Sequence, residues 1–476
     1  MRDVLQHPLG PLPWALSNCD GTLKKTNKAS LARHLEMKTT AADTIPQPSV
    51  CVIDGMSLIQ KTHGEHTTFG DVSEQVLMSA LNIGASSQRI DVVFDVYKST
   101  SIKNAERINR GSGVHFTNIS RGHKIQQWRK LLASSTSKTN LIRFIYTDWQ
   151  RQTLLNVLGD KELYVTCEDK CLRMCKSGCS DVPFLHSSQE EADTRIFLHV
   201  KHAATRYKTA IIVAEDTDVL ILGLAFSGDI PCELFMKSGT QNRTRYINIT
   251  KLSKILGNVA CKAMIGLHAY TGCDSVSAFA GKGKVSGLNL MLKNASFQQL
   301  FCNFGKEWTL ADVNLTTLHE FTCRLYARRS NVSSVNDMRY QLFRAKKGGI
   351  QSGQLPPCED CLCLHAQRAN YQAAIWCRSL LASPDTPSPN GHGWTLRQDG
   401  SLAIKWMNGD PAPDAVLEFL ACKCKKACKL PSCVCLANGM PCTDMCTLAL
   451  CDNRKEDDTS FDSSDDDEEE EEDTQE

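Results

Sequence analysis

Seven acidic side chains in this chain stand where an apolar run ends or where a helix is predicted to begin. Asp216 and Asp218 are the clearest pair, because in "AIIVAEDTDVLILGL" they lie between two apolar runs. Two negative charges one residue apart repel each other unless a positive charge lies between them. The other acids occur in "VIDG", "VFDVY", "EEAD" and "GCD". The full set is Asp54, Asp95, Glu191, Asp193, Asp216, Asp218 and Asp274.

Acids of this kind suit metal-dependent phosphodiester chemistry. Carboxylates that share one cleft raise each other's pKa and oppose folding unless cations offset their charge. Mg²⁺ prefers oxygen ligands and keeps several waters, so a few carboxylates hold each ion. Two ions about 4 Å apart can activate a water and stabilise the leaving oxygen of a phosphodiester. The set therefore predicts a site for two Mg²⁺ or Mn²⁺ ions. Taken singly, each acid is better explained as a surface charge or helix cap, as Asp216 would be for a helix starting near residue 218.

The elements that must position these acids alternate between strand and helix. A capped helix is predicted at 188–206, with Ser187 and Glu190 at capping-box spacing. Alternation of strands and helices predicts an α/β fold with a mostly parallel sheet flanked by helices, in which functional groups gather at the carboxyl ends of the strands. The predicted strands are "SVCVID" (49–54), "RIDVVFDVY" (89–97), "ELYVTCE" (162–168) and "TAIIVAE" (209–215).

The ordered segments "VIDG", "FDVY", "QEEAD", "EDTD" and "GCD" resemble those of the flap endonucleases and XPG-type 5′ nucleases of the PIN-like superfamily, over about residues 49–290. The resemblance implies a PIN-like fold and a structure-guided DNA nuclease. Val96 stands where the family has Gly, and Asp193 where it has Glu. The resemblance assigns the first metal ion to Asp54, Asp95, Glu191 and Asp193, and the second to Asp216, Asp218 and Asp274.

Basic residues near the acids are candidates for binding phosphate. Lys103, Arg107 and Arg110 recur at spacings of four and three, so they share one face of a helix. The resemblance supports this role, while the alternative is an ordinary solvated helix. The segment "FAGKGK" partly matches the Gly-rich helix–turn–helix with which the family grips duplex DNA, and it makes Lys282 and Lys284 candidate phosphate contacts.

A second candidate site is a cluster of eight cysteines among the 23 in the chain. Thiolates at this spacing suit tetrahedral Zn²⁺, and eight could form two Cys₄ sites. Because the segment has little apolar content, metal would have to supply its folding energy. A disulfide framework is the alternative, but no secretion signal accompanies it. The cysteines are Cys422, Cys424, Cys428, Cys433, Cys435, Cys442, Cys446 and Cys451.

The cysteine-rich segment resembles the tesmin-type CXC domain, a zinc-binding and DNA-binding module. The family carries three C-x-C pairs, whereas here only Cys451 follows Cys446. The resemblance implies two or three zinc ions. As a whole, the chain is similar to animal proteins that join a nuclease-like domain to such a module, through "PLGPLPWAL", "SSQEEADTR", "RANYQAAIW" and "GHGW".

Charge is unevenly distributed along the chain. The sequence has 54 basic and 53 acidic residues, but residues 456–476 contain 14 acids and no base, which leaves an excess of 15 basic residues in 1–455. A basic body with an acidic tail fits a nucleic-acid binder whose tail competes with phosphate for the basic surface. The alternative is a disordered tail that only keeps the protein soluble.

Several classes of protein are not indicated. The sequence has no run of eighteen apolar residues and no basic stretch followed by an apolar core at its start, so neither a membrane span nor a signal peptide is predicted. Scattered cysteines then indicate reduced thiols in the cytosol or nucleus. With DNA as the expected partner, we expect a nuclear protein.

Two functions are therefore carried forward. The first is a metal-dependent DNA nuclease aided by the zinc module, and the second is a non-catalytic zinc-dependent DNA or chromatin binder with an inert nuclease-like domain, including one derived from a mobile element. The predicted parts are an irregular lead-in (1–48), a PIN-like domain (49–290), a helical basic region (291–350), a linker with one helix (351–420), the cysteine-rich zinc module (421–453) and a disordered acidic tail (454–476).

Overall fold

The computed structural model describes most of the chain. Arg107, Arg110 and the predicted acidic tail (454–476) lie outside the described residues. The described residues are 2–98, 101–103, 119–239, 244–311, 313–345, 352–412, 422–430, 432–437, 442, 446–448 and 451–453.

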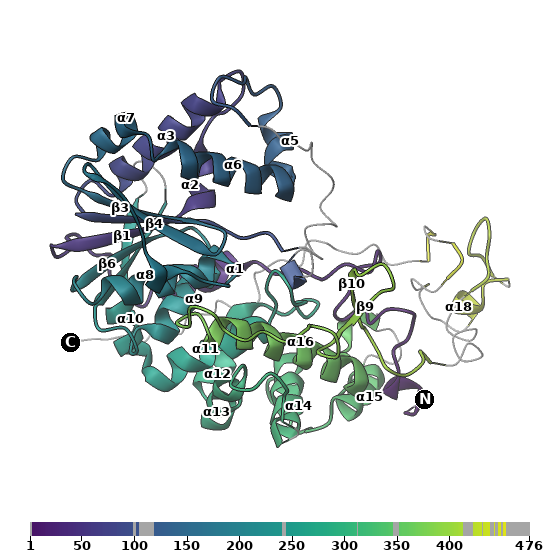
Figure 1. The fold of residues 1–476 in the computed structure, drawn as a ribbon. Helices are drawn as coiled ribbons and strands as arrows, with labels where there is room; N and C mark the ends of the chain where they lie inside the picture. The colour runs from purple at the N-terminus through teal and green to yellow at the C-terminus, as the bar shows by residue number, and fades with distance from the viewer. Residues whose placement is uncertain are drawn as a thin grey trace, which may run out of the picture.

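The centre of the fold is a twisted sheet of eight strands among the described residues, in the order β5-β4-β3-β2-β1-β6-β7-β8 (Figure 1). The five central strands β3, β2, β1, β6 and β7 run parallel, and the pairs β3–β4, β4–β5 and β7–β8 are antiparallel. The α/β fold with a mostly parallel sheet is thus confirmed. The strands are β1 (Ser49–Asp54), β2 (Arg89–Val93), β3 (Glu162–Cys167), β4 (Lys170–Cys175), β5 (Gly178–Asp181), β6 (Thr209–Val213), β7 (Glu233–Ser238) and β8 (Arg245–Asn248).

Both faces of the sheet are covered, which explains its apolar central strands. Along β1, Val50 and Val52 point into a first core on one face of the sheet, whereas Cys51 and Ile53 point into a second core on the other face. A strand buried on both sides needs apolar residues at every position. The second core is completed by α2 (Gly55–Lys61), α3 (Phe69–Ile83), α5 (Trp128–Ala133), α6 (Ser135–Asp148) and α7 (Gln152–Leu155), and the first by α8 (Ala192–Ala203), α9 (Thr217–Phe226) and α10 (Ile249–Leu256).

Chain topology brings three of the predicted acids, Asp54, Asp95 and Asp216, to the same edge of the sheet. From β1 the chain moves outward to β2 and β3, and it later returns to β6 on the opposite side of β1. Asp54 pairs in register with Val93, two residues before Asp95, and its neighbour Ile53 pairs with Val213. In sheets of this kind, the crevice for ligands opens where the connections diverge. The ends of β1, β2 and β6 form that point here.

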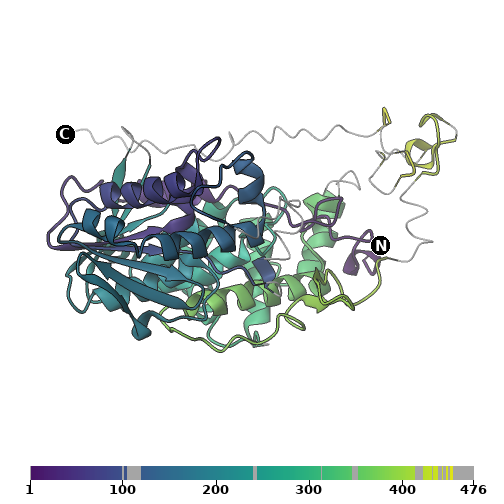
Figure 2. The same ribbon diagram turned by 45° about the horizontal axis from the view of Figure 1, so that its top comes forward.

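The helices that follow residue 257 belong to the same core as the sheet. Leu362 and Trp376 of α16 are buried in it, although α16 was predicted within a linker. Figure 2 shows these helices, in teal and green, grouped beside the sheet. They are α11 (Asn258–Tyr270), α12 (Lys284–Leu292), α13 (Ala295–Asn303), α14 (Val313–Tyr326), α15 (Val335–Ala345) and α16 (Glu359–Cys377), followed by the antiparallel pair β9 (Trp394–Leu396) and β10 (Leu402–Ile404) and, in the cysteine-rich segment, α18 (Val434–Ala437).

The N-terminal segment differs from the irregular lead-in that its composition predicts. It contains the short 3₁₀ helix η1 (Val4–Gln6) and the helix α1 (Lys28–Glu36). Leu31 and Leu35 share one face of α1 and are buried in the first core, as is Leu16 upstream. Apolar residues four apart place both side chains on the covered face of the helix. The segment is therefore an integral part of the fold.

Two helix starts predicted from the sequence have different outcomes. The helix predicted near residue 218 is confirmed as α9, with Asp216 Oδ1 accepting a hydrogen bond from the Asp218 amide at 2.9 Å. The helix predicted from residue 188 begins only at Ala192. Ser187 does not cap it, because its hydroxyl donates to the carbonyl of Ala382. No helix in the described part of the chain combines the length and apolar character needed to cross a bilayer.

Candidate metal centre

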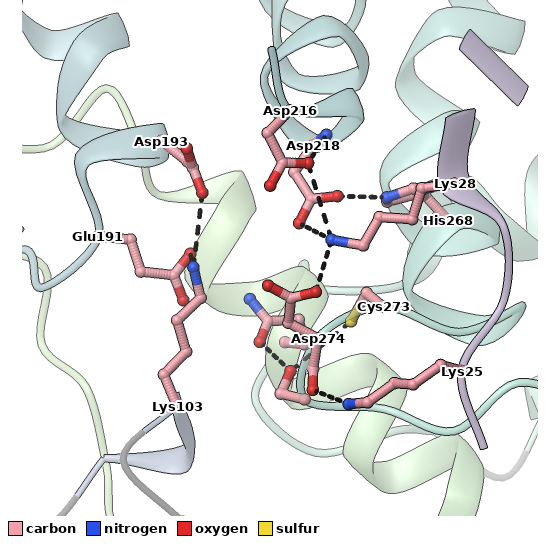
Figure 3. Close-up of polar contacts among 12 residues, drawn as sticks. Lys25, Lys28, Lys103, Glu191, Asp193, Asp216, Asp218, His268, Cys273 and Asp274 are labelled. Carbon is pink, nitrogen blue, oxygen red and sulfur yellow. Dashed lines mark hydrogen bonds and ion pairs between the residues drawn. The ribbon is translucent and has the colours of Figure 1, made fainter. Parts of the chain in front are cut away.

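Three of the predicted acids form a compact cluster at the switch point of the sheet (Figure 3). Asp193 lies in the first turn of α8, Asp216 caps α9, and Asp218 lies in the first turn of α9. One carboxylate oxygen from each lies within 4.8 Å of the others. Oxygens at this separation can be drawn onto a hard cation such as Mg²⁺ or Mn²⁺ with small movements, so the donor set fits such an ion.

Lys28 lies on one side of this cluster. Its Nζ is 2.9 Å from Asp218 Oδ2, 2.7 Å from Asp274 Oδ1 and 3.7 Å from Asp216 Oδ1. Its side chain is 18% exposed. Burial acts to lower the pKa of Lys28, but the charges of Asp218, Asp216 and Asp274 outweigh it and raise the pKa well above its usual value. Lys28 is therefore a fixed positive charge.

Lys103 occupies the corresponding place on the other side. Its Nζ lies 3.1 Å from Glu191 Oε2 and 3.4 Å from Asp193 Oδ2. The pKa of Lys103 is raised because the charges of Glu191 and Asp193 outweigh the effect of burial. The residue predicted to hold phosphate thus pairs with two acids, and its phosphate role stays a prediction.

His268 of α11 fixes Asp218. Its Nε2 donates to Asp218 Oδ1 at 2.8 Å, while its buried Nδ1 has no partner among the described residues. Burial lowers the pKa of His268 to about 4, so the imidazole is neutral near pH 7. Burial alone would raise the pKa of Asp218, but this hydrogen bond and the charge of Lys28 hold it well below the usual range. Asp218 is therefore ionised.

Helix capping and cation binding are compatible roles for the acids at the strand ends. Asp54 Oδ1 accepts from the amides of Met56 and Ser57 at 2.9 and 3.3 Å and caps α2. Asp95, two residues beyond β2, accepts a hydrogen bond through its Oδ1 from the Ala192 amide at 2.8 Å and so satisfies the first amide of α8. Each bond uses one oxygen and leaves the second for another ligand.

Crowding of these acids is visible in their pKa values. Burial, followed by the charge of Asp95, raises the pKa of Asp54 to about 7. Burial, followed by the charge of Asp218, raises the pKa of Asp216 to about 6, and the pKa of Asp193 is raised strongly by burial. A divalent cation would relieve this repulsion, which is the physical reason to expect one.

The loop after α11 delivers Asp274. It turns at Gly272, whose φ of +107° favours glycine and whose added Cβ would lie 2.8 Å from the backbone of Ala278. Ser275 in this loop donates to Gln372 of α16, and Lys25 Nζ donates to the Asp274 carbonyl at 2.8 Å. The loop is thus held from both the N-terminal segment and α16.

Lys284, predicted to contact phosphate, lies in the interior instead. It is 1% exposed, and its Nζ donates to the carbonyl of His268 at 2.8 Å and to Thr271 Oγ1 at 3.1 Å. Burial lowers its pKa to about 7. Lys282 lies nearer the surface, with its Nζ 4.8 Å from the centre of the Tyr326 ring. Of the two lysines, only Lys282 is placed where an external phosphate could reach it.

Two residues of the site, Lys28 and His268, were missed by sequence reasoning. Lys28 lies far upstream of the first strand, and "KTNKAS" carries no recognisable pattern. His268 occurs three residues after Ile265 on an apolar helix, where a histidine is usually a core residue. Neither residue type at these positions signals a carboxylate partner.

The cysteine-rich segment forms a separate candidate metal site. Its thiols approach one another at 3.6–3.9 Å, including Cys422–Cys428, Cys422–Cys442 and Cys435–Cys446. Four sulfurs about 2.3 Å from a zinc ion lie about 3.8 Å apart along each edge of the tetrahedron, whereas a disulfide requires about 2.05 Å. The cluster could therefore bind zinc.

Three groups of these thiols have the right proximity, with all sulfurs of a group within 4.8 Å. Lys423, Lys425, Lys426 and Lys429 are exposed beside them. Some cysteines belong to two groups, so a thiolate shared between two ions fits this arrangement. The groups are Cys422, Cys433, Cys435 and Cys442; Cys422, Cys424, Cys428 and Cys433; and Cys428, Cys442 and Cys451.

No protein-family model matches this chain, and no curated protein matches it.

Proposed function

We propose that the chain is a metal-dependent nuclease that hydrolyses phosphodiester bonds in DNA through a domain of the PIN-like, flap-endonuclease type. The observation that supports this proposal most directly is the meeting of Asp193, Asp216 and Asp218 within 4.8 Å at the switch point of the sheet. Glu191 and Asp274 join them through the two lysines, and Asp54 and Asp95 stand at the adjacent strand ends.

The chemistry adds one water across a phosphorus–oxygen bond. The water oxygen bonds to phosphorus, the bond to the leaving oxygen breaks, and the leaving oxygen takes up a proton. A bound Mg²⁺ or Mn²⁺ would lower the pKa of that water and offset charge on the phosphate. His268 keeps Asp218 oriented and ionised, while Asp95 fixes the start of α8 and with it Asp193. These contacts preorganise the acids for an ion and a phosphate.

The experiment compares cleavage of branched and flapped DNA in Mn²⁺ by the natural protein and by an Asp216→Asn/Asp218→Asn variant. A matched control is Asp229→Asn, because Asp229 is an exposed acid paired with Lys262 at 3.5 Å. We expect cleavage by the natural protein and the control, and a loss of at least about 100-fold in the double variant. Equal background cleavage by all three proteins would remove the enzymatic proposal.

For the cysteine-rich segment we propose a CXC-type module that binds two or three zinc ions and contacts DNA through its exposed lysines. The S–S separations and shared thiols support zinc, and Lys423, Lys425, Lys426 and Lys429 supply positive charge. The test is zinc release on chelation, read as metal content and as loss of DNA retention. Retention that survives complete removal of zinc would contradict this role.

The second candidate function is a non-catalytic DNA or chromatin binder with an inert nuclease-like domain, including one of mobile-element origin. The observation that favours it is that Lys28 and Lys103 already offset part of the acidic charge. In that case the Asp216→Asn/Asp218→Asn variant should bind DNA as the natural protein does, with no cleavage by either. In both proposals DNA is the partner and the nucleus the expected location, and a tagged copy that stays outside the nucleus would count against them.

A further inference from the structure

We propose that Lys28 is a built-in second cation, so that the acidic site takes one divalent metal ion rather than two. The inference rests on the proposed function, because it concerns how many ions the same acids bind. It begins from the position of the Lys28 ammonium among Asp216, Asp218 and Asp274 (Figure 3). These are the three acids that the resemblance described above assigns to a second metal ion.

The contacts of Lys28 exclude a metal ion from the same place. An ammonium has three N–H donors, and Lys28 Nζ lies 2.9 Å from Asp218 Oδ2 and 2.7 Å from Asp274 Oδ1, with Asp216 Oδ1 further away at 3.7 Å. A Mg²⁺ ion bound by Asp218 and Asp274 would have to lie about 2.1 Å from the oxygens that Nζ now contacts. Two cations cannot share that position, because their repulsion adds to the steric conflict.

The backbone holds Lys28 in place. It is the first residue of α1, whose cap Asn27 accepts a hydrogen bond from the Ser30 amide at 3.3 Å. Just before it, the Lys24 carbonyl accepts from the Ala278 amide at 2.8 Å, in the loop that carries Asp274. Just after it, Leu31 is buried in the core. Lys28 is therefore anchored on both sides, unlike a mobile surface lysine.

One position for a divalent ion remains. It lies among the oxygens of Asp193, Asp216 and Asp218, between the first turns of α8 and α9. This position uses Asp193, which Lys28 does not contact and whose Oδ2 lies 3.4 Å from Lys103 Nζ. A fixed ammonium beside it can stabilise negative charge on a phosphate, as a second ion would, but it cannot generate a hydroxide from a bound water. The structure thus assigns the two tasks to different cations.

The experiment counts Mn²⁺ ions bound per full-length chain by electron paramagnetic resonance, with zinc retained in the cysteine module. We expect one ion for the natural protein, for Lys28→Arg and for Lys25→Met, in which the lost Nζ donates to the backbone carbonyl of Asp274. Lys28→Met removes the ammonium and should bind two ions. Lys28→Met/Asp274→Asn should return to one, because the new site loses a ligand.

Each outcome separates this inference from the proposed function. Two ions in the natural protein, or one ion in a folded Lys28→Met, would overturn the inference while the nuclease proposal stands. No Mn²⁺ in any protein would instead defeat the proposed function. Should Lys28→Met fail to fold, Asp274→Asn decides: we expect it to keep the single ion of the natural protein, since Asp274 pairs with Lys28, and loss of that ion would overturn the inference.

Discussion

Three lysine ammonium groups, two partly buried and one fully buried, show how differently one side-chain type behaves in this fold. Lys28 and Lys103 lie beside carboxylates that raise their pKa, whereas Lys284 contacts only neutral oxygens and burial lowers its pKa to about 7. The first two therefore contribute charge to the site. The third carries little charge above neutral pH and serves as a hydrogen-bond donor between α11 and α12.

The pKa of Lys284 predicts a specific pH dependence of stability. Between pH 7 and 10.5 the unfolded lysine holds a proton that the folded one has lost, so stability from this group rises with pH. Relative to Lys284→Met, the free energy of unfolding of the natural protein should rise by up to about 1.4 kcal/mol per pH unit in this window. Denaturant unfolding from pH 7 to 9.5 measures it. Lys282→Met is the control, and a parallel pH profile for Lys284→Met would contradict the assignment.

At the scale of elements, the sequence predicts four of the five parallel strands, but it misses β7 and the antiparallel strands β4, β5 and β8. The segment 49–54 is β1 as predicted, and the starts of β2, β3 and β6 are also as predicted. These strands are buried on both faces, so their apolar runs are distinctive. The strands β4, β5, β7 and β8 were not predicted. In β4 and in the edge strand β5, "KCLRMC" and "GCSD" mix polar and apolar residues. Such strands form through pairing with a neighbour, which short-range sequence patterns do not contain.

The candidate site divides in the same way. Six of the seven acids could be predicted because they follow a recognisable strand or open a recognisable helix, whereas Asp274 lies in the loop after α11. Lys28 could not be predicted, because its role depends on a contact with Asp274, a residue far away in the sequence. Burial of Lys284 depends likewise on the packing of α12 against α11, which "FAGKGK" does not reveal.

The attachment of α8 to the sheet through Asp91 leads to a prediction about the stability of the protein. Asp91 in β2 is fully buried and accepts two hydrogen bonds from Arg89 and one from His199 of α8, each at 2.7 Å. Asp91→Ala would leave the Arg89 charge buried and uncompensated, so we expect a loss of about 3–5 kcal/mol in the free energy of unfolding. Asp229→Ala, at an exposed pair, should cost under about 1 kcal/mol. Denaturant unfolding of both variants measures the two losses. Equal losses would show that the buried hydrogen bonds of Asp91 stabilise the protein no more than an exposed ion pair does.

At the scale of the whole molecule, charge separates the body from its tail. Residues 1–455 have 15 more basic than acidic residues, and the last 21 residues contain 14 acids. If the tail competes with nucleic acid for the basic surface, deletion of 456–476 should raise DNA affinity by about tenfold at low salt. The gain should fall strongly by 0.5 M salt, because screening shortens the range of the interaction. Fluorescence anisotropy measures both, and unchanged affinity at low salt would reduce the tail to a solubilising role.

The reach of the N-terminal segment and of α16 into one loop has a consequence for synthesis on the ribosome. Lys28 is translated before any of the acids, but its partner Asp274 emerges much later, and the Gln372 side chain that supports this loop emerges later still. During synthesis, a nascent chain therefore already contains most of the acids of the site, while the Asp274 loop that completes their arrangement has not yet emerged. The finished site becomes available only after nearly all of the globular fold has left the exit tunnel.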